Sequence, residues 1–166
     1  MATSATHDPM EHVAMQPREV LRLLETVPML GDLATRERAV IAEVAEVVRC
    51  FADVQLLGVG QEVRWWYLVL NGRVQETVRA PDGTWAVVRE VGAGHSIGLD
   101  SILSGMTAAT QVSSTATSSF VRVPAADVAK LLRAHSPVAM KLQAALTEEF
   151  GTDLRSAVLA MVELVT

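Results

Sequence analysis

The middle of the chain, from Phe51 to Val123, is divided into short apolar runs by turn residues. The turn segments are Gly58-Val59-Gly60, Asn71-Gly72 and Pro81-Asp82-Gly83, and Asn-Gly and Asp-Gly are strong short-range hairpin signals. The runs predict strands at Val54–Leu57, Trp65–Leu70, Arg73–Val78, Trp85–Glu90, Gln111–Thr115 and Ser119–Val123. Many short strands at this spacing are typical of a sandwich, a jelly roll or a barrel.

Helical periodicity flanks this β region on both sides. Before it, a helix is predicted from Pro17 until Pro28 and Gly31 end it. A second helix is predicted from apolar residues at helical spacing, namely Val40, Ile41, Val44, Val47 and Val48. Further helices are predicted after Pro124 and Pro137. The predicted fold is therefore mainly β, an antiparallel jelly roll with N-terminal and C-terminal helices.

The chain divides into three expected parts. Residues 1–16 have no periodicity and predict a flexible tail, and residues 17–150 carry the β region with its helices. Residues 151–166 predict a last helix whose apolar stripe is Leu154, Val158, Met161 and Val165. This stripe is expected either to join the core or to form an association surface, through which the chain would bind another domain or a second copy as a homodimer.

Composition excludes several classes of protein. The formal net charge is −5, which does not fit the basic surface of a nucleic-acid-binding domain, so no nucleic-acid partner is expected. No apolar run reaches the length of about 18 residues that a membrane span requires, and no signal-peptide pattern is visible, so a cytoplasmic location without a membrane partner is expected.

Reactive side chains are few. The single cysteine, Cys50, follows two valines and predicts a small core residue, with a redox or ligand-sensing role as the alternative. The four histidines are scattered, so no metal site is expected. No pairing of a nucleophile with a base and no pair of carboxylates indicates catalysis, so no catalytic residue is assigned and the chain is not expected to be an enzyme.

The most informative segment is Gly-rich and covers residues 92–105. It predicts a tight turn that leads into one short helical turn at Asp100–Leu103, which stops at Gly105. Backbone N–H groups at such a helix start attract anions. Small residues in the turn allow a ligand to approach the backbone closely.

With its neighbours, this segment resembles the cyclic-nucleotide-binding domain family, including the effector domains of Crp/Fnr-type regulators. The resemblance runs from about Val27 to Leu146 and covers these segments in order: Val27–Leu30, Trp65–Val74, Asp82-Gly83, Gly94–Gly98 with Ser101–Leu103, and Phe120–Pro124 with Val128, Leu131 and Leu132. It implies a regulatory or sensor module in which a ligand shifts the last helices, with cAMP or cGMP as the candidate ligands. It places the ligand cassette at Ile97, Gly98, Leu99, Asp100, Ser101, Thr107, Ala108 and Ala109.

The two residues that hold the nucleotide in this family are not found at the matching positions. The glutamate for the ribose falls on Leu99, with Asp100 one residue away, and the arginine for the cyclic phosphate falls on Ala108. No Lys or Arg occurs between Arg89 and Arg122. Loss of one partner of a buried charge pair typically costs about 2–5 kcal/mol. The resemblance therefore predicts a degenerate cassette with diverged or lost nucleotide binding, and action through protein contact.

Two other functions remain open at this point. The chain could bind cAMP or cGMP through backbone amides and an arginine outside the cassette. Arg64 and Arg73 are the candidates for this arginine. The aromatic run 65–67 could either stack on the nucleotide base or pack in the core. It could instead be a small-barrel enzyme of the cupin type. That enzyme would need a cluster of histidine and carboxylate ligands, and His95 is the one histidine in the β region.

Overall fold

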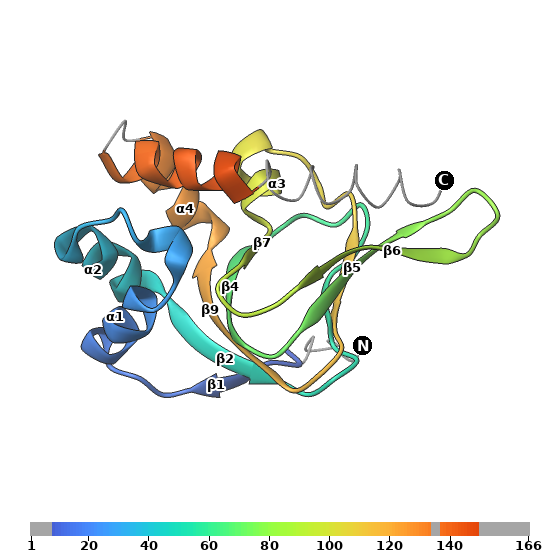
Figure 1. The fold of residues 1–166 in the computed structure, drawn as a ribbon, viewed down its shortest axis with the longest axis horizontal. Helices are drawn as coiled ribbons and strands as arrows, with labels where there is room; N and C mark the ends of the chain where they lie inside the picture. Colours follow the sequence, from blue (N-terminus) through green and yellow to red (C-terminus); the bar gives the residue numbers. More distant parts are fainter. Residues whose placement is uncertain (1–7, 134–136, 150–166) are drawn as a thin grey trace, which may run out of the picture.

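The computed structural model describes residues 8–133 and 137–149, and Figure 1 shows two β-sheets with helices gathered against one of them. Sheet A contains, in spatial order, β1 (Glu11–Val13), β2 (Glu46–Cys50), β9 (Ser118–Pro124), β4 (Trp65–Asn71) and β7 (Ser96–Ile97). Sheet B contains β3 (Gln55–Leu57), β8 (Gln111–Ser114), β5 (Val74–Arg79) and β6 (Trp85–Val91). The helices are α1 (Pro17–Glu25), the short 3-10 helix η1 (Pro28–Leu30), α2 (Thr35–Val44), α3 (Leu99–Ser104), α4 (Ala125–Arg133) and residues 137–149.

Every strand pair is antiparallel, and the predicted jelly-roll class with flanking helices is confirmed. Sheet A is buried on both faces, because the helices cover one face and sheet B covers the other. Along β4, Trp66 and Leu68 belong to the helix-side core, whereas Tyr67 and Val69 belong to the core between the sheets. Burial on both faces explains why residues 65–70 form an almost unbroken apolar run.

The second helix is shorter in the structure than the sequence predicts. Helix α2 ends at Val44, and residues 46–50 form strand β2, which pairs with β9. Val47 packs against the helices and Val48 packs between the sheets, so the two adjacent valines are buried on opposite faces. Adjacent β-branched residues that are both buried fit a central strand better than a one-sided helix.

Of the two dipeptides that predict hairpins, Asp82-Gly83 lies in one and Asn71-Gly72 does not. Asp82-Gly83 lies in the hairpin between β5 and β6, where Asp82 Oδ1 accepts a hydrogen bond from the Thr84 amide at 2.9 Å. Asn71-Gly72 does not close a hairpin, because β4 belongs to sheet A and β5 to sheet B. At this point the chain crosses from one sheet to the other, which a local turn motif cannot distinguish from a hairpin.

Part of the segment 1–16, which the sequence predicts as a flexible tail, forms a strand in the structure. Residues 11–13 form strand β1 at the edge of sheet A, and Met10 is buried between the sheets. Residues 1–7 and the predicted last helix, 151–166, lie outside the described residues. In the described part of the chain, no helix has the length and apolar character to cross a membrane.

Candidate functional site

The Gly-rich segment connects β6 to α3 through the short strand β7. Its turn is held to the neighbouring strand by two backbone hydrogen bonds, from the Gly94 amide to the Val69 carbonyl at 2.8 Å and from the Val69 amide to the His95 carbonyl at 3.0 Å. β7 then pairs with β4, with Tyr67 opposite Ile97 and Leu68 opposite Ser96 in register. The turn is therefore fixed to β4 of sheet A.

Gly98 makes the change of direction from β7 into α3. Its φ is +90°, and an added Cβ would lie 2.9 Å from the Trp65 carbonyl oxygen and 3.0 Å from Val63 Cγ1. A residue without a side chain is required here both by the backbone conformation and by the space. The helix then ends at Gly105, which also has a positive φ, as the sequence predicts.

The cassette residues do not converge on one surface. Ile97 and Ala108 are buried in the core between the sheets, whereas Leu99 is buried in the helix-side core. Asp100 is exposed, and Ser101 is partly buried on the same helix. The position of the family's acid is therefore a core position on the other side of sheet A from the position of its arginine.

The last part of the cassette lies against the turn before β4. Thr107 and Ala109 are exposed, whereas Ala108 is 5% exposed. The Ala108 amide donates to the Gln61 carbonyl at 2.8 Å, and its carbonyl accepts from the Gly60 amide at 2.8 Å. Because this amide already has a partner, it is not available for a phosphate oxygen without local rearrangement.

The aromatic run at the start of β4 is mainly structural. Trp66 is fully buried on the helix side, and Tyr67 makes an edge contact with Phe120 at 5.6 Å between ring centroids. Trp65 is partly buried, and the guanidinium carbon of Arg122 lies 3.9 Å from its ring centroid. These contacts support core packing for Trp66 and Tyr67 and a cation–π contact for Trp65.

Arg89 is a site residue that the sequence analysis did not single out. It lies opposite Glu76 in the β5–β6 ladder, and its Nε lies 2.9 Å from Glu76 Oε2, with both side chains about one-fifth exposed. Its Nη2 donates to the Ser96 carbonyl at 3.2 Å. The signal was available, because Arg89 stands two residues before buried Val91 and therefore on the same face of β6.

Arg64 and Arg73, the arginines named from the sequence, lie elsewhere. Both are exposed or at a strand end, and Arg73 pairs with Glu90 at 3.3 Å through side chains that are at least half exposed. An exposed pair of this kind contributes little and leaves the charge in solvent. Of the arginines considered, Arg89 is the one that contacts the Gly-rich turn.

Glu149 is the second site residue that sequence reasoning missed. Its carboxylate accepts hydrogen bonds from the Ser96 amide and from Ser96 Oγ, both at 3.1 Å, and lies 3.4 Å from His95 Nδ1. The contact joins residues 53 positions apart, so no local pattern could predict it. A carboxylate of the chain itself therefore occupies the donors of the turn.

A shallow cavity of about 180 Å³ lies beside this turn. Its lining consists of Arg89, Glu90, Val91, Gly92, Ala93 and His95. Within residues 8–133 and 137–149, no group of three or more His, Cys, Asp or Glu side chains is arranged to hold a metal ion.

Together, an antiparallel jelly roll, helices against one sheet and a Gly-rich turn that leads into a short helix are the features of a jelly-roll regulatory domain. The sequence model of the family described as "Cyclic nucleotide-binding domain" matches residues 52–135, about half of the chain, and this chain belongs to that family. Domains of this family are typically non-catalytic regulatory modules.

Solved structures with the same fold include a cyclic nucleotide-binding domain from Methylobacillus flagellatus, with a TM-score of 0.80 and 19% identity over 97% of this chain and 92% of that one. The regulatory subunit of a cAMP-independent protein kinase A from Trypanosoma brucei matches with a TM-score of 0.63 and 20% identity over 78% of this chain and 51% of that one. The regulatory domain of Toxoplasma gondii protein kinase A, solved with cAMP, matches with a TM-score of 0.69 and 16% identity over 80% of this chain and 50% of that one. No curated protein sequence matches the chain.

Proposed function

We propose that this domain is a regulatory module that has lost the usual cyclic-nucleotide recognition of its family and acts by contact with another protein domain or a second copy. The observation that carries the proposal is Ala108. A buried methyl group stands where the resemblance places the phosphate-binding arginine, and its amide is already bonded to Gln61. A cyclic phosphate at this position would lose its countercharge and one backbone donor.

The neighbouring anion donors support the same proposal. The Ser96 amide and hydroxyl are bonded to Glu149, and Arg89 is paired with Glu76. A nucleotide phosphate at this turn would therefore have to displace Glu149 and would approach a second carboxylate, Glu76. Both effects oppose an anionic ligand.

The fold itself does not decide between the two nucleotide hypotheses. The Trypanosoma brucei protein is described as cAMP-independent and the Toxoplasma gondii structure contains cAMP, yet both share this fold. Function within one fold depends on the residues of the site. For this chain those residues are Leu99, Ala108, Arg89 and Glu149.

One observation favours the second candidate, a cAMP or cGMP sensor that uses an arginine outside the cassette. Arg89 lies on the inner face of β6 and contacts the carbonyl of Ser96. If Glu76 released it, Arg89 would be the cation for a phosphate at the Gly-rich turn. The variant Glu76→Gln tests this candidate, because it should then raise nucleotide affinity by at least about tenfold.

Calorimetry with cAMP and with cGMP tests the main proposal. The unaltered protein should show no saturable binding up to millimolar nucleotide, whereas Ala108→Arg should bind with a dissociation constant of about 30 μM or less, which is at least about 30-fold below that limit. The matched control is Val59→Arg, which adds the same charge at an exposed position outside the cassette and should not bind. A micromolar dissociation constant for the unaltered protein would contradict the proposal.

The proposed surface for the partner contact is the apolar stripe in the sequence, Leu154, Val158, Met161 and Val165. We expect the chain to form a homodimer through this stripe. The proposed role is cytoplasmic and non-catalytic. Sedimentation at high protein concentration should show a dimer, and Val158→Glu should convert it to a monomer because a charge in an apolar contact is costly. A monomer at all concentrations in the unaltered protein would remove this part of the proposal.

A further inference from the structure

The N-terminal segment 8–13 docks on strands that do not need it for their own pairing. Strand β1 has three residues and pairs with β2, which is already paired with β9 on its other side. In the sequence the segment lies outside residues 52–135, which match the family model, although in the structure it contacts Arg122 of that range. Segment 8–13 is therefore the edge strand of sheet A, and the contacts that hold it against β2 define a docking site.

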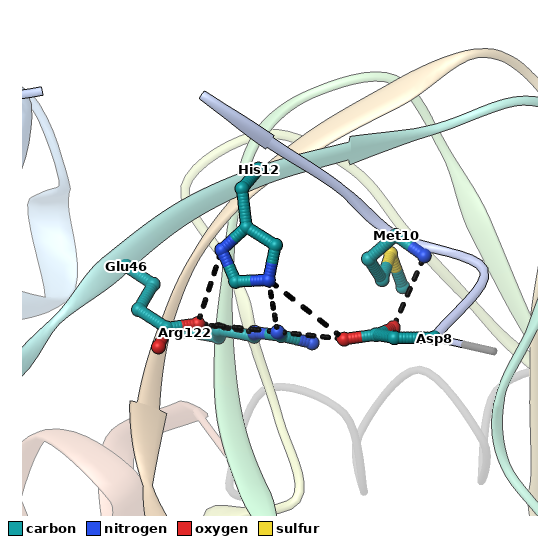
Figure 2. Close-up of polar contacts among 5 residues, drawn as sticks. All are labelled: Asp8, Met10, His12, Glu46 and Arg122. Atoms are coloured by element: carbon teal, nitrogen blue, oxygen red, sulfur yellow. Dashed lines mark hydrogen bonds and ion pairs between the residues drawn. The ribbon is translucent and has the colours of Figure 1, made fainter. Parts of the chain in front are cut away.

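The first part of this site is a buried cation. Arg122 of β9 has a side chain that is 3% exposed, and its guanidinium stacks on Trp65 of β4. Figure 2 shows this guanidinium between two carboxylates, with Asp8 Oδ2 2.8 Å from Nη2 and Glu46 Oε2 3.1 Å from Nε. The His12 ring lies over it, with Nε2 at 3.3 Å from Nη2. One of these two carboxylates, Asp8, comes from the docked segment.

The second part is an apolar position. Met10 is 6% exposed and belongs to the same core cluster as Val48 and Cys50 of β2. The Met10 amide donates to Asp8 Oδ1 at 3.1 Å, so the carboxylate and the thioether side chain are fixed relative to each other by a local bond. A carboxylate two residues before a long, unbranched apolar side chain therefore satisfies both parts of the site.

The third part is a second arginine on the exposed side of the edge. Arg49 of β2 lies opposite Glu11, and its Nε and Nη2 each donate to a Glu11 carboxylate oxygen at 2.9 Å. Two arginines of the sheet thus meet two carboxylates of the segment. This charge complementarity selects an acidic peptide, and the three ladder positions select an extended one.

The segment is held less firmly than the sheet beneath it. The side chains of Asp8, Glu11 and His12 are 44%, 61% and 57% exposed, so most of its polar contacts compete with water. Ala14, Met15 and Gln16, which link it to α1, are exposed. A short edge strand with few buried contacts opens at a lower free energy than the core strands.

We propose that the β2 edge of sheet A, with Arg122, Trp65 and the Met10 position, is a docking site for an extended acidic peptide, and that residues 8–13 occupy it in cis. The partner class is a segment that carries a carboxylate two residues before a long, unbranched apolar residue and adds as a strand to β2. Residues 8–13 then act as an internal competitor for that partner. This site is separate from the cassette, so it does not depend on whether a nucleotide binds there.

The test uses the full chain with its own segment weakened, Asp8→Asn/Met10→Ala, and a fluorescein-labelled peptide of residues 8–15 as the probe. Fluorescence polarisation should show binding to this variant at least tenfold tighter than to the unaltered protein, in which the site is filled. The same peptide in which the residues at positions 8 and 10, Asp8 and Met10, are exchanged should bind at least tenfold more weakly. Met140→Ala, at an exposed methionine, is the matched protein control and should behave as the unaltered chain.

Saturable binding that is equal for the two peptides would overturn the proposal, as would no binding to a variant that retains the circular dichroism and cooperative unfolding of the unaltered protein. If the variant does not fold, hydrogen exchange of the unaltered chain decides. The amides of residues 11–13 should exchange at least tenfold faster than those of β9 and β4. Equal exchange rates would show that the segment is inseparable from the core and would contradict its role as a competitor.

Discussion

The carboxylate of Asp8 and the guanidinium of Arg122 are 114 positions apart in the sequence and 2.8 Å apart in the structure (Figure 2). This pair joins the N-terminal segment to β9, the central strand of sheet A. The guanidinium of this pair is buried and contacts the side chains of Trp65 and Tyr67. The pair therefore couples the docking of the segment to the ionisation of Asp8.

This coupling predicts a pH-dependent stability. Burial by itself raises the pKa of Asp8, but the hydrogen bonds from Arg122 and the Met10 amide and the charge of Arg122 together hold that pKa below its ordinary value. A carboxyl whose pKa is lower in the folded state stabilises the fold above the unfolded-state pKa and loses this contribution as the pH falls through the folded value. Chemical denaturation should show Asp8→Asn less stable than the unaltered protein by about 0.5–1 kcal/mol at pH 7.

The difference between the two proteins should begin to shrink below about pH 4, where Asp8 becomes protonated in the unfolded chain, and should be lost as the pH falls through the lower pKa of the folded state. Asp53→Asn provides a control at an exposed aspartate elsewhere in the chain. A difference for Asp8→Asn that stays constant from pH 7 to pH 3 would contradict the proposed ion pair.

The second prediction concerns the turn into α3. Gly98→Ala should lower the free energy of unfolding by about 2–4 kcal/mol, because the new Cβ adds a clash with the Trp65 carbonyl to the cost of a positive φ. Gly105→Ala is the control at the other end of the same helix, where φ is +69° and no atom lies within 4 Å of an added Cβ. It should cost about 1–2 kcal/mol. Equal losses in denaturant unfolding would show that contact with Trp65 plays no part.

The third prediction concerns the contact between the helix at 137–149 and the Gly-rich turn. Glu149→Ala removes the acceptor of the Ser96 amide, so exchange of that amide should become faster by about tenfold, equivalent to about 1.4 kcal/mol. Gln143→Ala, at an exposed position of the same helix, should leave this rate unchanged. Unchanged protection of Ser96 in the Glu149 variant would show that another group holds the turn in place.

The fourth prediction addresses the sensing alternative for Cys50. The thiol is 5% exposed, and burial raises its pKa, an effect that a hydrogen bond involving Ser114 only partly offsets. The folded protein should therefore react with iodoacetamide at pH 8 at least about 100-fold more slowly than the unfolded protein. The control is Cys50→Ala/Ala52→Cys, with its thiol at an exposed position, and it should react near the unfolded rate. Rapid alkylation of native Cys50 would restore the case for a reactive cysteine.

Most of the β framework follows from local features of the sequence. The strand predicted at Trp65–Leu70 is observed at Trp65–Asn71, and the strand at Trp85–Glu90 is observed at Trp85–Val91. Apolar runs and turn residues carry this information because they act over a few neighbouring positions. Strand β2 was missed for the same reason, since Val44, Val47 and Val48 also fit a helical spacing and nothing local separates the two readings.

The site was predictable only in part. The Gly-rich turn and its helix were located from residues 92–105, because glycines at positive φ leave a local signature. The ion pair of Arg89 with Glu76 and the hydrogen bonds that Ser96 donates to Glu149 were not predicted. The face of Arg89 follows from alternation with buried Val91, but its pairing with Glu76 depends on strand register, and the Ser96 contact depends on where a distant helix lies.

The sequence by itself determined the positions of most strands, the Gly-rich turn and the absence of Lys and Arg between residues 89 and 122. Only the tertiary structure decided that β4 and β5 lie in different sheets, that Leu99 and Ala108 face separate cores, and that Asp8 reaches Arg122. The physical reason is the range of the forces involved. Backbone preference and alternation act between neighbours, whereas burial and ion pairing act between side chains that only the closed fold brings together.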